Sequence, residues 1–198
     1  MKKLLLLTVI CLMSIISISA QNFGVKAGLN FASISGDDAE DFDGRTSFHI
    51  GAYTEFEISE SFSFQPELLY SSQGAKSSFS EDGFDVDMDI KLNYLNIPLM
   101  AKYYFSDGFN FEFGPQIGFL LSAEAEVSFA GVSETEDIKD DLKGTDFGLN
   151  FGLGYKLESG LNFGLRYNLG LSKLDDSDEM EESDIKNGVF QISLGYSF

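Results

Sequence analysis

Residues 146–157 read DFGLNFGLGYKL, and residues 161–174, after a short turn, read LNFGLRYNLGLSKL. In both segments a large apolar residue occupies every second position, and the positions between hold mostly glycine, asparagine or a charged residue. This period of two predicts two β-strands that form a hairpin. A strand usually holds about five or six residues, whereas a tilted strand that crosses a membrane needs about nine to eleven. The length of these segments and their single apolar face favour a barrel wall with lipid outside and a narrow polar interior.

Six other segments repeat this alternation, so the chain is expected to form eight strands. Short turns and four long connections alternate between the strands, which places both chain ends and the turns at one end of the barrel. Outer-membrane barrels have this arrangement, with short periplasmic turns and longer extracellular loops. We therefore predict an all-β fold, an eight-stranded antiparallel up-and-down transmembrane β-barrel, in which residues 21–198 form one domain. The six other segments are residues 22–34, 46–58, 62–73, 91–105, 109–121 and 187–198.

Three prolines interrupt the expected strands. Pro66, Pro98 and Pro115 each lack the backbone N–H that a strand donates to its neighbour. Because a closed barrel has no free edge, we expect a bulge at each proline. Beyond a bulge, the inward and outward assignments can shift by one residue.

The first twenty residues are typical of a secretory signal. Two lysines precede an apolar run that is too short for a membrane-spanning helix, and small residues follow this run. We expect removal of residues 1–20, after about Ala20. Cys11 would leave with this segment, so the mature chain would hold no cysteine. A lipoprotein cysteine is the alternative interpretation of Cys11, but residues 8–10 form a poor lead-in for it.

The mature chain is expected to be strongly acidic. Without the two lysines of the signal it holds 11 basic and 32 acidic residues, a formal charge of −21. This charge argues against nucleic acid as a partner, because phosphate binding needs clustered lysine and arginine. The four long connections hold 25 of the 32 acidic residues, within residues 35–45, 74–90, 123–146 and 173–186.

These four long acidic extracellular loops are expected to be solvated and to repel one another. Three functional interpretations stay open for them: repulsion of anions, attraction of cationic partners, and divalent-cation bridging to lipopolysaccharide phosphates. Asp85, Asp87 and Asp89 form a DxDxD pattern that resembles the start of a calcium loop, and they are weak metal candidates. Ile90 stands where a calcium loop needs its turn glycine, and Asn96 stands where it needs a bidentate glutamate. We predict no other metal site and no cofactor.

The inward positions carry equal numbers of acidic and basic residues. The interior of an eight-stranded barrel is roughly filled by side chains, and buried charges must pair. We therefore predict an interior charge network that closes the barrel, with Arg166 as its hub. A path for protons or solutes is the alternative. The predicted network residues are Lys26, Glu55, Glu57, Glu67, Lys102, Glu112, Lys156 and Arg166.

His49 is the only histidine, and it falls on an inward position near the outer rim. An outer-membrane protease or acyltransferase would need this histidine within hydrogen-bond reach of a rim acid or hydroxyl. No fixed spacing in the sequence supports such a site, so we predict no catalytic residues and no enzyme. A soluble ligand-binding barrel of the lipocalin type would carry its apolar residues inward, and the signal segment and the terminal Phe198 disfavour it.

A family resemblance rests on four segments: FSFQPELLYSSQG (62–74), LNYLNIPLMAKYYF (92–105), FEFGPQIGFLLSAEAE (111–126) and GLRYNLGLSKL (164–174). They resemble the recurring motifs of the PorT-like outer-membrane β-barrel proteins of the porin family. The resemblance covers essentially the whole mature chain, and it implies about eight strands in the outer membrane of a Gram-negative cell. It implies little about activity, because most members have no assigned biochemical role; the founding member is linked to protein secretion and gliding. The family offers no catalytic residues to transfer.

The chain ends in an alternating strand with Tyr196 and Phe198 in phase. A terminal aromatic residue on such a strand is similar to the signal that the outer-membrane assembly machinery reads. We therefore expect this machinery and outer-membrane lipid as partners of a monomeric barrel.

The sequence favours a structural or surface-interaction role through the acidic loops, with the barrel interior closed by paired charges. The alternative is a narrow passive pore or a transport or secretion accessory. An interior of sparse small residues would favour the pore, whereas the balance of four acids and four bases speaks against it.

Overall fold

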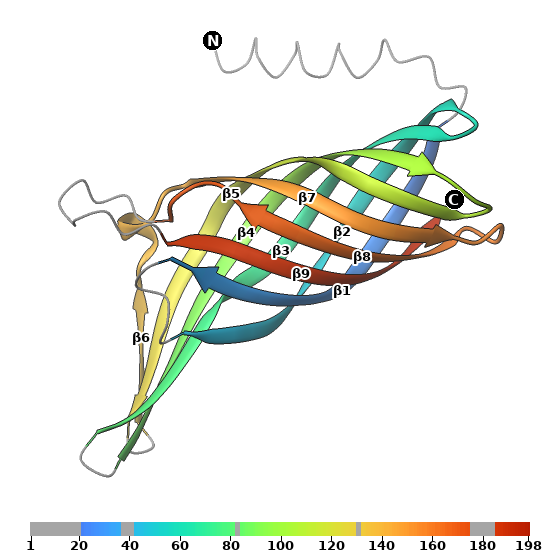
Figure 1. Ribbon diagram of the computed structural model, residues 1–198. Helices are drawn as coiled ribbons and strands as arrows, with labels where there is room; N and C mark the ends of the chain where they lie inside the picture. The colour runs from blue at the N-terminus through green and yellow to red at the C-terminus, as the bar shows by residue number, and fades with distance from the viewer. Residues whose placement is uncertain (1–20, 37–41, 82–83, 130–131, 175–184) are drawn as a thin grey trace, which may run out of the picture.

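The computed structural model describes residues 21–36, 42–81, 84–129, 132–174 and 185–198. They form a closed antiparallel β-barrel with a sheet that projects from one end (Figure 1). Among them, no helix is long and apolar enough to cross a membrane. The predicted signal, residues 1–20, lies outside the described residues. The strands are β1 (Gln21–Ser35), β2 (Asp43–Ser59), β3 (Phe62–Glu81), β4 (Phe84–Tyr104), β5 (Phe109–Phe129), β6 (Val132–Asp137), β7 (Thr145–Lys156), β8 (Leu161–Gly170) and β9 (Lys186–Ser197), and the 3₁₀ helix η1 (Lys139–Asp141) follows β6.

Eight of the nine described strands close the barrel. They pair antiparallel in the order β1, β2, β3, β4, β5, β7, β8 and β9, and β9 pairs with β1 to complete the ring. Strand β6 pairs with the outer part of β5 and lies outside the ring. The prediction of an eight-stranded antiparallel barrel is therefore confirmed. We call the end that carries the short connections β2–β3, β4–β5 and β7–β8 the turn end, and the opposite end the loop end.

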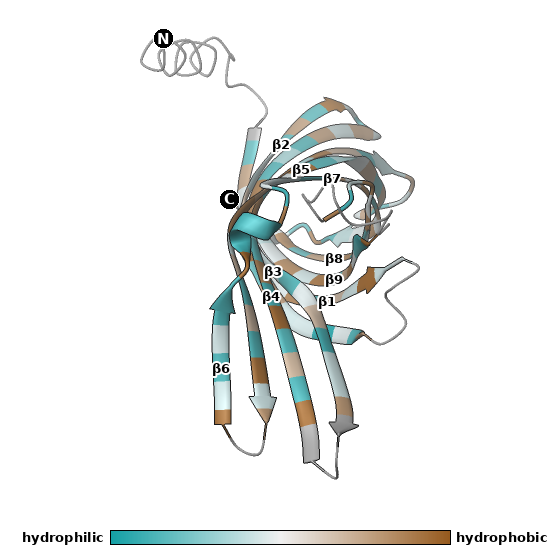
Figure 2. Ribbon diagram, turned by 90° about the vertical axis from the view of Figure 1, so that its left-hand side faces the viewer, coloured by the Kyte–Doolittle hydropathy of each residue, from teal (hydrophilic) through white to brown (hydrophobic). Residues whose placement is uncertain are grey.

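Side chains alternate between the two faces of the barrel wall. Along β8, Leu165, Tyr167 and Leu169 point outward and are exposed, whereas Arg166 and Asn168 point inward and are buried. Figure 2 shows this alternation as stripes along the strands. The outward side chains of the other ring strands are likewise mostly large and apolar, as in a wall that faces lipid. The predicted apolar outer face and polar interior are therefore confirmed.

The expected bulges at Pro66, Pro98 and Pro115 are absent from the described strands. The β3–β4 ladder skips two residue pairs after Pro66 of β3, and the β4–β5 ladder skips two after Pro98 of β4; both ladders then resume in the same register. Pro115 keeps its place in the ladder with β7. The reason is that a proline removes a hydrogen-bond donor without adding a residue, so neither the register nor the faces shift. The irregularity of the β4–β5 pair lies instead between Asn93 and Tyr94.

Two of the four segments predicted as loops are strand for most of their length, so the loop prediction is wrong there. Residues 74–90 continue β3 and β4, and much of residues 123–146 continues β5 and adds β6. The acidic content of these segments suggested loops, yet residues 84–90 read FDVDMDI and keep the alternation of a strand. Charged side chains on one face of a strand can stay in water, so they do not prevent the strand from forming. The outer parts of β3, β4, β5 and β6 form a four-stranded sheet that projects from the loop end (Figures 1 and 2). We call residues 75–81, 84–91, 123–129 and 132–137 the extension.

Replacing Gly160 with alanine is expected to destabilise the barrel by about 1–2 kcal/mol, the cost of a left-handed backbone for a residue with a side chain. Gly160 has φ of 89°, and a Cβ added there would lie 2.4 Å from the backbone oxygen of Ser197. The measurement is urea-induced unfolding of the refolded protein in detergent. Gly144→Ala is the control, because a Cβ there meets nothing within 4 Å. Equal midpoints for the two variants would contradict the prediction.

Candidate functional site

The centre of the barrel interior is filled by four charged side chains, Lys26, Glu67, Glu112 and Arg166, which we call the central ion cluster. Arg166 on β8 donates two hydrogen bonds to the carboxylate of Glu67 on β3, over 2.9 and 2.8 Å, and one to Glu112 on β5, over 2.7 Å. Lys26 on β1 forms an ion pair with Glu67 at 3.3 Å. The Arg166 side chain is 1% exposed. Four strands from around the ring are thus tied together by charges that have little access to water.

A second group, Glu55, Lys102, Tyr104 and Lys156, lies nearer the turn end, and we call it the turn-side ion cluster. Glu55 pairs with Lys156 at 3.1 Å and with Lys102 at 3.7 Å. The Tyr104 hydroxyl donates a hydrogen bond of 2.5 Å to the same carboxylate. Glu55 is therefore buried with three partners for its charge.

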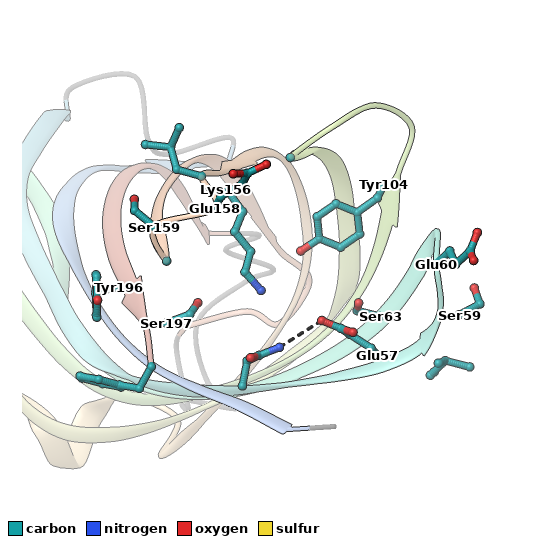
Figure 3. A pocket seen from close by; sticks show the side chains of 16 residues that line it. Glu57, Ser59, Glu60, Ser63, Tyr104, Lys156, Glu158, Ser159, Tyr196 and Ser197 are labelled. Atoms are coloured by element: carbon teal, nitrogen blue, oxygen red, sulfur yellow. Dashed lines mark hydrogen bonds between the residues drawn. The ribbon is translucent and has the colours of Figure 1, made fainter. Parts of the chain in front are cut away.

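Gln65 joins the two clusters. Its amide nitrogen donates to Glu67 over 2.7 Å, and its amide oxygen accepts from Lys102 over 3.1 Å. Glu57 joins neither cluster: its exposed carboxylate accepts a hydrogen bond of 3.1 Å from Asn22 (Figure 3). The structure thus brings together seven of the eight predicted network residues. Glu57 stays apart because it lies two residues beyond Glu55, where β2 reaches the open turn end.

Inward glycines leave the space that these clusters occupy. A Cβ added to Gly152 would lie 2.6 Å from an oxygen of Glu112, and one added to Gly24 would lie 2.2 Å from the ring of Tyr53. The small inward residues of β1 and β7 therefore leave room for long side chains of the neighbouring strands β2 and β5.

An apolar cluster closes the interior at the loop end. Sequence reasoning missed this feature, although the apolar residues within the acidic connections, such as Ile138, Leu142 and Leu174, were its signal. We call the cluster the apolar cap. Its buried members are Leu92, Tyr94, Leu120, Ala123 and Leu174, and the partly buried Ile34, Ile90, Ile138, Leu142 and Ile185 pack against them.

The turn end, in contrast, holds a cavity of about 870 Å³, which we call the vestibule. Figure 3 shows Tyr104 and Lys156 pointing into it, with Ser63 and Ser197 on its wall. A deeper cavity, beside residues of both ion clusters, measures only about 20 Å³. That volume holds about one water molecule. The interior is therefore open toward the turn end and filled beyond it.

His49 lies within hydrogen-bond reach of a hydroxyl. Its Nδ1 is 2.8 Å from the amide oxygen of Asn30, and its Nε2 is 2.9 Å from the hydroxyl of Ser193. This serine, histidine and asparagine have the order of a catalytic triad. All three are buried, however, and the small cavity beside Ser193 has no room for a substrate. Asn30 also bonds Ser71 and Gln191, so the group belongs to a polar network that fills the barrel.

The extension has an apolar face and an acidic face. Because its strands pair in register, residues directly opposite one another form rows across the sheet. The rows of the apolar face are Phe79, Val86, Phe129 and Val132; Ser77, Met88, Val127 and Glu134; and Ala75, Ile90, Ala125 and Glu136. The rows of the acidic face are Ser78, Asp87, Ser128 and Ser133; Lys76, Asp89, Glu126 and Thr135; and Lys91, Glu124 and Asp137.

The polarity of the wall inverts where the barrel passes into the extension. The outward positions of β4 change from Leu99 and Leu95 to Asp89, whereas its inward positions, which include Lys102 and Asn96 within the barrel, are Ile90 and Val86 in the extension. An outward face needs apolar residues only where lipid covers it. The inversion, near Asn93 of β4, therefore marks the level at which the wall leaves the lipid.

Asp85, Asp87 and Asp89 lie on strand β4 and not in a loop. Asp89 pairs with Arg45 at 2.8 Å, and Asp87 accepts a hydrogen bond from Ser78 over 2.7 Å; the side chain of Asp85 lies outside the described part. Residues two apart on a strand are separated by about 7 Å, too far for a compact calcium loop. On a strand, this pattern does not form the compact loop that it resembles in sequence. Within the described residues no group of three or more His, Cys, Asp or Glu could hold a metal ion.

Lysines neutralise part of the acidic face. Lys91 pairs with Glu126 at 2.5 Å, and Lys76 pairs with Asp89 at 3.6 Å. The hydrogen bond to Glu126 raises the pKa of Lys91 above its usual value.

Comparisons with known proteins agree with this architecture. The chain matches the family described as outer membrane protein beta-barrel domain over residues 19–176. It resembles the crystal structure of Ail, the attachment invasion locus protein of Yersinia pestis, with 16% identity and a TM-score of 0.50, over 91% of this chain and 100% of that chain. The same protein in complex with the heparin analogue sucrose octasulfate gives 17% identity and a TM-score of 0.52, over 91% and 100%.

Neisserial surface protein A (NspA) gives 14% identity and a TM-score of 0.56, over 91% of this chain and 100% of that chain. At these identities the likeness concerns the fold. No curated protein sequence matches the chain significantly.

Proposed function

Because the chain belongs to the outer membrane protein β-barrel domain family, we propose that it is a closed outer-membrane barrel that acts through the surface it displays outside the cell. The observation that carries this proposal is the filled interior. From the turn end to the loop end, the turn-side ion cluster, the central ion cluster and the apolar cap follow one another. A solute would have to break buried ion pairs to pass.

Single-channel conductance of the mature, refolded protein in a planar bilayer tests this closure. We expect a folded barrel that passes no current, because its interior charges are paired and its cap is apolar. Folding is checked beforehand by the shift in gel mobility on boiling, and a known porin in the same bilayer is the positive control. Steady cation-selective openings would contradict the proposal and would favour a pore.

The displayed surface is proposed to meet a cationic partner. On the acidic face of the extension, Asp87, Glu124 and Asp137 form no ion pair within the described residues. Surfaces of one charge sign attract partners of the opposite sign and speed their encounter. The heparin analogue bound by the Yersinia pestis protein is polyanionic, and the acidic extension would repel such a ligand. Divalent cations that bridge the acidic segments to lipopolysaccharide phosphates are a further proposed partner.

The chain is proposed to be a monomeric, non-enzymatic, PorT-like member of its family. The motifs of residues 62–74, 92–105, 111–126 and 164–174 support the PorT-like assignment. The lack of space beside Ser193 supports a non-enzymatic role. Tyr196 and Phe198, which are both exposed at the turn end with ring centroids 5.4 Å apart, are proposed as the signal for the assembly machinery.

A secretion accessory is the second candidate function, and the vestibule is the observation that favours it. This cavity of about 870 Å³ opens at the turn end, which faces the periplasm in barrels of this kind. A periplasmic partner could insert a segment into the vestibule and bind the barrel while the interior beyond it stays closed.

A further inference from the structure

We propose that the apolar face of the extension binds an amphipathic, cationic segment of a partner protein; this proposal rests on the surface function proposed above. At the tip of the face, Phe79, Phe129 and Val132 are 49%, 47% and 66% exposed. They lie in one row beyond the level where the wall inverts, so lipid does not cover them. Val86, between Phe79 and Phe129 in this row, is 7% exposed, so the exposed apolar area belongs to the three other residues. Exposed apolar area that neither lipid nor protein covers marks interaction sites.

Acidic side chains border the same face. Glu134 and Glu136 on β6 are exposed and lie directly opposite Val127 and Ala125. Neither glutamate forms an ion pair within the described residues. Figure 2 looks onto the extension and shows β6 at its free edge, beside β5.

Bases are confined to the opposite face. Lys76 and Lys91 are the two lysines of the extension strands, and both pair with acids of the acidic face. The apolar face therefore offers hydrophobic area with an unneutralised negative border. A segment with apolar residues on one side and lysine or arginine beside them complements both features.

Charge separates this occupant from two others. A second copy of the chain would bring the same glutamates to the interface, and like charges across an interface oppose association. Acids on an edge strand also oppose pairing with another copy. The phosphates of a lipid surface carry the same sign as Glu134 and Glu136 and are repelled by them.

The probe is a short amphipathic leucine–lysine peptide with one tryptophan, and its counterpart carries glutamate in place of every lysine. The protein contains no tryptophan, so the emission of the peptide reports binding without background. The refolded mature chain is placed in nanodiscs of zwitterionic lipid, with empty nanodiscs as the blank. We expect saturable binding of the lysine peptide, with a blue shift of its emission, and no binding of the glutamate peptide.

Paired variants locate the site. Phe79→Ser with Phe129→Ser, and separately Glu134→Gln with Glu136→Gln, are each expected to weaken binding about tenfold or more at low salt. The matched control is Glu124→Gln with Asp137→Asn, which removes two charges from the acidic face of the same sheet. We expect a change below about twofold for this control, because it leaves the apolar face intact. Gel mobility confirms that every variant folds.

Three outcomes would overturn the inference. Equal weakening by Glu134→Gln with Glu136→Gln and by the control pair would show that overall charge attracts the peptide. That result would be consistent with a cationic partner but would contradict binding at the apolar face. Self-association that Phe79→Ser with Phe129→Ser abolishes, measured by light scattering, would assign the face to a second copy. Failure to bind the lysine peptide refutes the amphipathic segment, and failure to bind polylysine as well refutes the cationic partner of the proposed function.

Discussion

Replacement of Arg166 with methionine is expected to destabilise the barrel by about 3–5 kcal/mol, the usual cost of leaving buried charges without their partner. Arg166 holds Glu67 through two hydrogen bonds and Glu112 through one. Without it, two buried carboxylates face each other with Lys26 as the remaining cation of the central ion cluster. The measurement is urea-induced unfolding in lipid vesicles, followed by gel mobility.

Two further variants separate the loss of an ion partner from the loss of packing. Adding Glu112→Gln to Arg166→Met leaves Lys26 and Glu67 as a balanced ion pair and is expected to restore more than half of the lost stability. Lys76→Met is the control: its side chain is 52% exposed in its ion pair with Asp89, and pairs near water contribute about 0–1 kcal/mol. Similar losses for Arg166→Met and Lys76→Met would argue against a closed central cluster.

Replacement of Leu165 with arginine is expected to cost about 2–4 kcal/mol, the penalty for a basic residue on the lipid face near the middle of the membrane. Leu165 lies at the middle of β8, points outward and is flanked by apolar residues of β7 and β9. The measurement is again unfolding in lipid vesicles, because detergent offers a less uniform apolar layer.

Ser128→Arg is the control for Leu165→Arg. Ser128 lies on the continuation of the outward face, above the level where the wall inverts, and directly opposite Asp87. A base opposite an acid on neighbouring strands stabilises a sheet by about 0.2–1 kcal/mol. We therefore expect no loss of stability. A loss comparable to that of Leu165→Arg would place the extension within the membrane and would contradict the proposed boundary.

The barrel itself could be predicted because its signal is local. Each strand shows its alternation within a dozen residues, and each short turn requires the next strand to run antiparallel beside the one before it. Residues 74–90 and 123–146 were predicted as loops because an acid-rich composition is typical of loops. The alternation in FDVDMDI is the stronger signal, and it indicates a strand. The apolar cap escaped because its members come from strand ends and connections that approach one another only in the closed ring.

The membership of the interior clusters was largely predictable, whereas their pairing was not. An inward position can be assigned from one strand, but the partner across the barrel depends on the stagger of all eight strands. Arg166 meets Glu67 across 99 residues of sequence, and His49 meets Ser193 across 144. Nothing local in the sequence encodes these encounters.

The seam between β1 and β9 has a consequence for assembly. It runs from Gly24 opposite Ser197 to Ser35 opposite Lys186. Every other strand pair in the ring joins strands that follow one another in the chain, when β6 is left out. Because the seam closes the longest loop, it is the costliest contact to form early. Lys26 lies on one side of this seam and Arg166 lies beyond the other, and both bind Glu67. Glu67 on β3 and Arg166 on β8 are not on neighbouring strands, so their ion pair forms only once the sheet has curved into the closed ring.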